Sequence, residues 1–293
     1  MLERRLLRIR RVGLMVKPKI REAGPVIEQL ARFFAERGIE FLAEPVVQEM
    51  APGCRATLAP RQELPATIDL LIVLGGDGTM LAAARLMGGR RVPVLGVNFG
   101  GLGYLTEFTL DELFPALERL LTEEALIDSR MMLDASVHRA GQCVAEYSVL
   151  NDAVVNKSAL ASSMQIECWI DGAPVTTFRA DGLIVSTPTG STAYSLSAGG
   201  PIVHPSVAAL VITPICPHML TNRPLVISDR SEVKLALRTP REEVTLTLDG
   251  QVGFALQVED EVILRKSAKT FDLVSPVNKN YFQVLRDKLY WGK

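Results

Sequence analysis

The first third of the chain alternates short apolar runs with amphipathic segments. Continuously apolar runs at residues 12–16 and 70–74 are typical of strands buried on both faces of a sheet. An apolar stripe over residues 25–37, followed by Gly38, predicts a helix that ends at the glycine. Further strands are expected at 39–43 and 93–97, and further helices at 80–87 and 110–121. This β-α-β-α order predicts an open, mostly parallel sheet with helices on both faces.

From about residue 128 onward the spacing of apolar residues changes to that of strands. Residues 164–170, 233–237 and 244–248 alternate apolar and polar side chains, which places the apolar ones on one face. Asp171-Gly172 and Asp249-Gly250 are typical of hairpin turns. The pattern predicts an all-β domain over residues 128–275. Residues 281–290 predict a last helix, and we expect the segment 276–293 to pack back on the first domain, residues 1–127.

The overall charge of the chain is close to neutral. With 293 residues and a net charge of −1, the sequence offers no global basic field that would attract nucleic acid. Five arginines gather near the N-terminus: Arg4, Arg5, Arg8, Arg10 and Arg11. We expect a solvated, partly frayed end there, and an arm that binds nucleic acid or a membrane is the alternative.

The four cysteines are scattered, and none belongs to a Cys-x-x-Cys pair. This spacing argues against a zinc site and against a disulfide framework. The thiols are interpreted as reduced core residues of a cytosolic protein: Cys54, Cys143, Cys168 and Cys216. The apolar run at 12–16 is too short for a signal peptide, and the run at 208–216 is too short for a membrane span. We therefore expect a cytoplasmic protein with no membrane partner.

A glycine-rich segment, Gly75-Gly76-Asp77-Gly78-Thr79, follows the buried run at 70–74 and opens a helix. Glycines let backbone N–H groups approach a ligand closely, and a helix N-terminus adds partial positive charge, so the segment predicts a phosphate-binding loop. A carboxylate among phosphates is unfavourable unless it holds a metal ion or accepts a proton. Asp77 is therefore a candidate general base beside a phosphoryl donor. The alternative is an ordinary turn in which Asp77 or Thr79 caps the helix.

Two further polar segments follow apolar runs. A second glycine-rich loop, residues 98–104, follows the strand at 93–97. It would lie at the carboxyl end of that strand, and ligands bind at such ends in open α/β sheets. Tyr104 is a candidate to stack on a base, and the alternative is a flexible loop with Tyr104 in the core. Asn151 and Asp152 end another apolar run and are candidates to bind ribose hydroxyls or a base edge, with a turn as the equally good alternative.

The longest motif is the segment from Asp181 to Tyr194. A strand there runs into a stretch dominated by Ser, Thr, Gly and Pro, and residues 197–200 repeat the small-residue theme. Small hydroxyls and backbone amides suit a nucleotide, and the loop is unusually long for a structural turn.

Together, these segments closely resemble the bacterial NAD kinases over roughly residues 70 to 260, and residues 181–194 are the most specific match. The resemblance implies that Asp77 is the proton acceptor. It implies phosphate binding by four residues: Gly75, Gly76, Gly78 and Thr79. It also implies an NAD site lined by Asp77, Gly78, Asn98, Tyr104, Asn151, Asp152, Arg179, Asp181, Thr192, Ala193, Tyr194, Ser195, Leu196, Ser197 and Gln251.

The same resemblance implies a reaction and a fold. The γ-phosphoryl group of ATP would pass in line to the 2′-hydroxyl of the adenosine ribose of NAD, with Mg²⁺ or another divalent cation bound mainly through ATP. The fold would be two-domain, an N-terminal α/β open parallel sheet plus a C-terminal all-β sandwich-like domain. Members of this kind are usually homodimers or homotetramers. Whether polyphosphate replaces ATP stays open.

Two positions depart from the family's usual pattern. Asp152 stands where many members have glutamate, so its contact with ribose could pass through water. Ser162 lies where relatives often carry a basic residue. With Arg179 at this position, the resemblance implies a preference for NAD over NADH, and the alternative is that Arg179 is a surface charge paired with a nearby acid. We expect Arg179 and Asp181 on one strand that leads into the Ser/Thr-rich loop. Positions two apart on a strand face the same side, so both side chains should face the cleft.

Two other functions are compatible with parts of the pattern. A lipid kinase shares the glycine-rich loop and predicts an apolar acyl-chain tunnel, against which the Ser/Thr-rich residues 186–192 argue. A non-catalytic NAD-binding sensor predicts binding without turnover and does not require a carboxylate at Asp77.

Overall fold

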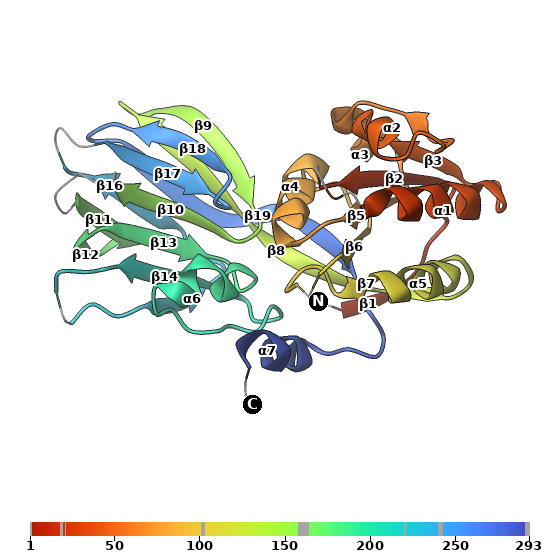
Figure 1. Ribbon diagram of the computed structural model, residues 1–293. Helices are drawn as coiled ribbons and strands as arrows, with labels where there is room; N and C mark the ends of the chain where they lie inside the picture. The colour runs from red at the N-terminus through yellow and green to blue at the C-terminus, as the bar shows by residue number, and fades with distance from the viewer. Residues whose placement is uncertain are drawn as a thin grey trace. The chain divides into compact units, whose positions relative to one another are not determined.

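A computed structural model describes residues 2–17, 20, 22–100, 103–157, 164–219, 221–239 and 243–290. The chain divides into two compact units. Unit 1 comprises residues 1–129 and 271–293, and unit 2 comprises residues 130–270. The strands β8 (Glu124–Arg139) and β19 (Glu261–Val274) each carry the chain from one unit to the other (Figure 1).

Unit 1 is built on a parallel sheet with the strand order β4-β3-β2-β5-β6. Its strands are β2 (Arg11–Val16), β3 (Glu40–Ala43), β4 (Thr57–Leu58), β5 (Leu70–Leu74) and β6 (Val94–Asn98). Every residue of β5 is buried, as expected for a strand with helices on both faces. The open parallel sheet predicted from the apolar runs is confirmed.

Helices cover both faces of this sheet (Figure 1). α1 (Ala23–Ala35) and α5 (Leu110–Thr122) pack with alternate sheet residues such as Leu95 and Val97 in one core cluster. Gly96, between these two residues, faces the other side, where an added Cβ would lie 2.8 Å from Met80 Sδ of α4 (Asp77–Met87). The remaining elements of unit 1 are α2 (Val46–Met50), α3 (Leu64–Thr67), β7 (Phe108–Thr109) and α7 (Tyr281–Leu289), with a 3₁₀ turn at Arg61–Glu63.

The N-terminal residues form a strand, so the expectation of a frayed end is wrong. β1 (Leu2–Leu6) pairs antiparallel with β8, with Leu2 opposite Asp128 and Leu6 opposite Glu124. Four of its five residues are exposed and only Arg5 is partly buried, as expected for a strand at the edge of a sheet.

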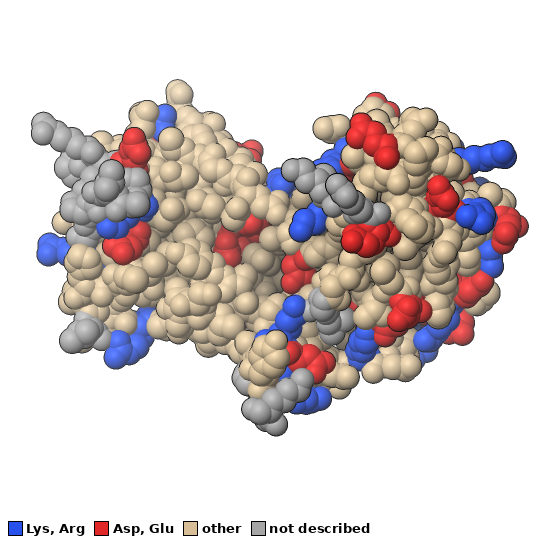
Figure 2. All heavy atoms as spheres, viewed as in Figure 1, with Lys and Arg blue, Asp and Glu red and all other residues tan. Residues whose placement is uncertain are grey.

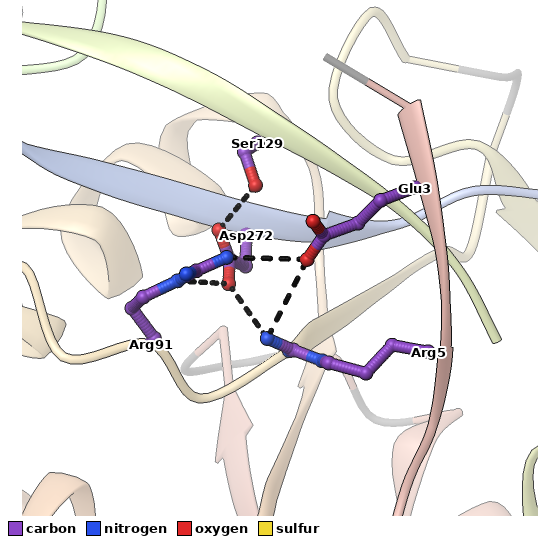
Figure 3. Close-up of polar contacts among 5 residues, drawn as sticks. All are labelled: Glu3, Arg5, Arg91, Ser129 and Asp272. Carbon is purple, nitrogen blue, oxygen red and sulfur yellow. Dashed lines mark hydrogen bonds and ion pairs between the residues drawn. The ribbon is translucent and has the colours of Figure 1, made fainter.

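A buried carboxylate anchors β1 within unit 1 (Figure 3). Asp272 is fully buried and lies 3.4 Å from the guanidinium groups of both Arg5 and Arg91. Its second oxygen accepts a hydrogen bond from the Ser129 hydroxyl at 2.7 Å. Glu3 pairs with Arg91 at 3.1 Å and extends the network to the surface. The cluster therefore ties together four segments that are far apart in the sequence.

Unit 2 contains two layers of β-strands around one core. One layer has the order β12-β11-β16-β19, with β8 paired to β19 and β9 to β8, and the other is a six-stranded antiparallel sheet β15-β14-β13-β10-β17-β18. Inward residues such as Ile166, Leu235, Val185 and Leu246 share one core cluster. The predicted sandwich-like domain is confirmed. Its strands are β9 (Gln142–Val149), β10 (Asp152–Lys157), β11 (Met164–Ile170), β12 (Ala173–Ala180), β13 (Gly182–Ser186), β14 (Ala209–Ile215), β15 (Leu225–Ser228), β16 (Val233–Leu237), β17 (Val244–Leu248) and β18 (Val252–Leu256).

Both predicted Asp-Gly turns are confirmed. Asp171 and Asp249 have φ values of 51° and 50°, and the glycines that follow them also have positive φ. These are the left-handed conformations that a two-residue hairpin of this kind requires, and aspartate tolerates them better than most residues.

The cysteines are free, and only one of the four is buried. Cys168 lies in the core of unit 2, Cys54 is half-buried, and Cys143 and Cys216 are exposed, so the expectation of core thiols is wrong for the last two. Over the described ranges, no helix is both long and apolar enough to span a membrane. Figure 2 shows acidic and basic side chains interspersed over the visible face of unit 1, in keeping with the near-neutral net charge.

Candidate active site

The glycine-rich loop of unit 1 joins β5 directly to α4. Gly75 donates its backbone N–H to the Val97 carbonyl at 2.9 Å, and an added Cβ there would lie 2.5 Å from Thr79 Oγ1. Gly76 is the N-cap residue of α4, and no side chain caps the helix. The alternative in which Asp77 or Thr79 caps the helix is therefore wrong. The first turn of an α-helix directs N–H groups outward, so this loop has the geometry of an anion site.

The carboxylate of Asp77 holds the second glycine-rich loop. Asp77 Oδ2 accepts the backbone N–H of Tyr104 at 2.9 Å. Oδ1 accepts the backbone N–H groups of Leu105 and Thr106 at 3.0 and 3.3 Å, and the Thr106 hydroxyl at 3.3 Å. An added Cβ on Gly103 would lie 2.2 Å from Asp77 Oδ1, so only glycine permits this approach. Asp77, at the start of α4, thus fixes the loop that follows β6.

Asn98 and Tyr104 occupy the two ends of that second loop. Asn98 donates its amide to the Thr106 hydroxyl at 3.1 Å, and its carbonyl oxygen accepts the Gly100 N–H at 2.9 Å. Burial raises the pKa of the half-buried Tyr104 phenol, and the nearby Asp77 carboxylate adds to the shift. Gly101 and Leu102, in the middle of the loop, lie outside the described residues.

In unit 2, Asn151 and Asp152 form a corner at the start of β10. The Asp249 carboxylate accepts the backbone N–H groups of Leu150, Asn151 and Asp152 at 3.0, 2.7 and 3.3 Å. The Asp249 N–H in turn donates to the Asp152 carbonyl at 3.0 Å. The sequence predicts Asp249 only as a turn residue, because nothing in the local pattern connects residues 97 positions apart.

The Ser/Thr-rich loop forms hydrogen bonds to the backbone carbonyl groups of the same corner. The Thr187 hydroxyl donates to the Leu150 carbonyl at 2.6 Å, and the Thr187 N–H donates to the Asn151 carbonyl at 2.9 Å. An added Cβ on Gly190 would lie 2.2 Å from the Asn151 carbonyl oxygen, so this position also requires glycine. The corner is therefore fixed on both its N–H and its C=O sides.

Asp152 carries the most perturbed carboxyl group near either loop. Its side chain is buried, with 4% exposed. Burial and, second, the charge of Asp249 raise the pKa of Asp152 to about 7. A carboxyl group with this pKa changes charge near neutral pH, which is unusual for aspartate.

The segment after Gly190 mixes buried and exposed side chains. The turn Gly190–Thr192 and the short helix α6 (Tyr194–Ser197) replace the open loop that the composition suggested. Ser195 is fully buried and its hydroxyl lies 2.9 Å from that of Thr213, while the Thr192 hydroxyl donates to the Thr189 carbonyl. The half-buried or exposed residues here are Thr192, Ala193, Tyr194, Leu196 and Ser197. Gln251 is exposed at the β17–β18 turn.

Arg179 and Asp181 do not share a strand, so the expectation that they face the same side of one strand is wrong. β12 ends at Ala180, and β13, which belongs to the other layer, begins at Gly182. Asp181 lies where the chain changes layer and pairs with Lys157 at 3.1 Å.

These two residues are also separated from the Asn151–Asp152 corner. β13 pairs with β10 so that Ser186 lies opposite Asp152 and Gly182 lies opposite Asn156. Gly182 is roughly 13 Å along the strand from Ser186 at ~3.3 Å per residue. Arg179 and Asp181 precede Gly182, beyond that far end of the strand pair. Among the described residues, no cluster of three or more His, Cys, Asp or Glu side chains is arranged to hold a metal ion.

Comparisons with known proteins agree over nearly the whole chain. The ATP-NAD kinase N-terminal domain matches residues 12–125, and the ATP-NAD kinase C-terminal domain matches residues 150–275. An NAD kinase of Geotalea daltonii is 50% identical over 268 residues, which cover 92% of this chain and 94% of that protein. The crystal structure of yeast NADH kinase complexed with NADH is 26% identical, with a TM-score of 0.89 over 97% of this chain and 89% of that chain. An NAD kinase from Archaeoglobus fulgidus in complex with ATP, 23% identical, shares the fold with a TM-score of 0.76 over 96% of this chain and 98% of its own.

Proposed function

The chain belongs to the ATP-NAD kinase family, and we propose on that premise that it transfers the γ-phosphoryl group of ATP to the 2′-hydroxyl of the adenosine ribose of NAD. The observation that carries the proposal is the loop Gly75–Thr79, in which a phosphate-binding helix N-terminus and a carboxylate occur together. Phosphoryl transfer from ATP to an alcohol needs both parts, because donor phosphates must be held while the hydroxyl loses its proton.

Asp77 is the proposed proton acceptor. As the ribose oxygen bonds to the γ-phosphorus and the bond to the ADP oxygen breaks, the hydroxyl proton passes to the carboxylate. Oδ1 of Asp77 accepts three hydrogen bonds from the second loop, whereas Oδ2 accepts one. A carboxylate oxygen offers two lone-pair directions, so Oδ2 is the proposed point of contact with the acceptor hydroxyl.

The phosphates and the dinucleotide are proposed to meet two sets of residues that share Gly78. The phosphate-binding residues are Gly75, Gly76, Gly78 and Thr79, at and next to the start of α4. The NAD-binding residues are Asp77, Gly78, Asn98, Tyr104, Asn151, Asp152, Arg179, Asp181, Thr192, Ala193, Tyr194, Ser195, Leu196, Ser197 and Gln251. Because Arg179 and Asp181 lie at the far end of β13 from Asp152, we assign them to the nicotinamide half of the dinucleotide.

Mg²⁺ or another divalent cation is proposed to bind mainly through ATP. Mg²⁺ keeps several water ligands and commonly binds through substrate phosphates with one or two protein carboxylates. When bound it would screen the charge of the phosphates. The chain's own contribution is the helix N-terminus and glycine-loop amides that hold the phosphates. A cytoplasmic location and a homodimer or homotetramer complete the proposal.

The test is production of NADP by the purified full-length protein from NAD, ATP and Mg²⁺. An NADP-specific dehydrogenase measures the product, and phosphorus NMR assigns the phosphate to the 2′ or the 3′ position. Diacylglycerol in mixed micelles replaces NAD in a parallel reaction. The proposal requires a 2′-phosphorylated product from NAD and none from the lipid. NAD binding without turnover would identify a sensor, and lipid phosphorylation would identify a lipid kinase.

A further inference from the structure

We propose that Asp249 is a positioning residue, whose carboxylate fixes the Asn151–Asp152 corner in the conformation that receives NAD. The inference rests on the proposed function, because it concerns the same dinucleotide site. Asp249 does not have to touch the substrate. It acts through the backbone of the residues that do.

The Asp249 carboxylate forms several hydrogen bonds to the backbone of the corner. One carboxylate accepts three consecutive backbone N–H groups, from Leu150 to Asp152, at 3.0, 2.7 and 3.3 Å. Three successive N–H groups point in one direction only at a tight corner, so the acceptor selects the corner conformation. Asp249 is itself 7% exposed, and hydrogen bonds to a charged acceptor in such a place are strong.

A second Asp-Gly turn in the same unit provides a matched contrast. Asp171 sits in an equivalent Asp-Gly turn with φ 51°, against 50° for Asp249. Its carboxylate is exposed and accepts one N–H, from Glu232, at 2.9 Å. An Asp-Gly turn alone therefore requires neither burial nor three acceptor contacts. The extra burial and contacts of Asp249 belong to the corner it holds.

The charge of Asp249 also affects Asp152. Burial is the larger cause that raises the pKa of Asp152 to about 7. The negative charge of Asp249 beside buried Asp152 is the second cause. Two neighbouring residues at the corner are uncharged: Ser186 of β13 lies opposite Asp152, and Thr187 donates to the Asn151 carbonyl. The residue that shapes the corner therefore also contributes to the elevated pKa of Asp152.

Asp249→Asn is the sharpest variant. Asparagine tolerates the left-handed backbone and keeps the volume, but its amide nitrogen places a donor where Oδ2 accepted the Leu150 N–H. We expect KM for NAD to rise roughly fivefold to a hundredfold, from one lost buried acceptor, with KM for ATP unchanged. The pH midpoint of KM for NAD is expected to fall below that of the wild type, because the like charge beside Asp152 is gone.

Two further variants distinguish the effect of the corner's geometry from the effect of the Asp249 charge. Thr187→Val removes the hydroxyl that holds the Leu150 carbonyl and leaves the charges intact, so KM for NAD is expected to rise with an unmoved midpoint. Asp171→Asn is the matched control and is expected to leave KM, kcat and the midpoint at wild-type values. If Asp249→Asn does not fold, Thr187→Val tests the positioning of the corner on its own.

Amide hydrogen exchange tests the positioning independently of turnover. Peptides covering residues 150–152 are expected to lose protection in Asp249→Asn and to keep it in Asp171→Asn. Unchanged protection together with a wild-type KM would overturn the inference. A wild-type protein that makes no NADP would instead overturn the proposed function, and the exchange result would still decide the role of Asp249.

Discussion

The loop regions of the two units use buried or half-buried carboxylates in different ways. In unit 1, Asp77 is both the acid of the glycine-rich motif and the acceptor that holds the neighbouring loop, through Tyr104, Leu105 and Thr106. In unit 2 these tasks are divided. Asp152 is the acid of the motif, and Asp249, from a distant turn, holds the backbone around it.

The difference has a physical consequence for each acid. Asp77 is half-buried and receives four hydrogen bonds from its surroundings. Asp152 is buried next to a second acid, and its pKa rises to about 7 as a result. We infer a division of labour in which the carboxylate of unit 1 serves proton transfer and the two carboxylates of unit 2 serve binding. The following predictions test that division.

Asp77→Asn is expected to produce the largest effect. Loss of a general base lowers turnover by ~10²–10⁴, and asparagine keeps the size of the side chain. The measurement is kcat at saturating NAD and ATP. Asp69→Asn is the matched control, because Asp69 is another aspartate of unit 1 that accepts two backbone N–H groups, from Arg10 and Arg11, at 2.8 and 2.9 Å. A kcat near that of wild type in Asp77→Asn would remove Asp77 from the chemistry.

Asp152→Asn is expected to change how stability depends on pH. An aspartate whose folded-state pKa lies near 7 binds its proton more tightly in the folded state, so its ionisation destabilises the fold as pH rises from about 4 to 7. Asparagine does not ionise. The variant is therefore expected to exceed wild type at pH 8 by up to about 4 kcal/mol and to lose this advantage towards pH 4. Urea unfolding midpoints at both pH values measure the difference.

A pH-independent difference between Asp152→Asn and wild type would contradict this account of the unit 2 corner. Asp171→Asn serves as the control here as well, because Asp171 is exposed in the same unit. Its stability relative to wild type is expected to change little between the two pH values.

Asp272→Asn tests a carboxylate that lies outside both the Asp77 loop and the Asn151–Asp152 corner. The change removes the charge that faces Arg5 and Arg91 at 3.4 Å, and we expect a loss of roughly 1–3 kcal/mol in stability. Turnover per folded molecule is expected to stay at the wild-type level. Urea unfolding and steady-state kinetics on the same preparation measure the two quantities, and a selective loss of kcat would show that the cluster in Figure 3 reaches the chemistry.

Arg179→Gly is expected to have the smallest effect. We expect wild type to prefer NAD over NADH and the variant to narrow the ratio of the two kcat/KM values by less than about fivefold, since Arg179 is exposed. Oxidised nicotinamide is cationic, so the Arg179 guanidinium alone would disfavour NAD. A preference for NAD would therefore arise through a neighbouring acid or through the shape of the site. An unchanged ratio would make Arg179 a surface charge.

The sequence predicted the features that depend on local periodicity. The apolar run at β5, the alternation in β11 and β17, and both Asp-Gly turns appear in the structure. The glycine positions were also identified, but the reason for Gly103 was not, because it is the approach of Asp77 from another element. Periodicity places a residue on a face and does not say what packs there.

The features that sequence missed depend on pairing between distant segments. Asp249 meets the Asn151–Asp152 corner because β17 pairs with β10, and β1 forms because β8 lies beside it. Arg179 and Asp181 were expected on one strand, and the change of layer between β12 and β13 is set by the core of the sandwich, which no local spacing reveals.

The most direct test of the division of labour compares Asp77→Asn with Asp152→Ala in one experiment. Calorimetric titration gives the affinity for NAD, and steady-state kinetics gives kcat at saturation, both with wild type as reference at pH 8. The account predicts that the main effect of Asp77→Asn is a kcat lowered ~10²–10⁴. It predicts NAD binding weakened by roughly 1.5–3 kcal/mol, more than in Asp77→Asn, with a nearly unchanged kcat for Asp152→Ala. The reverse pattern, or an equal loss of both quantities in both variants, would contradict it.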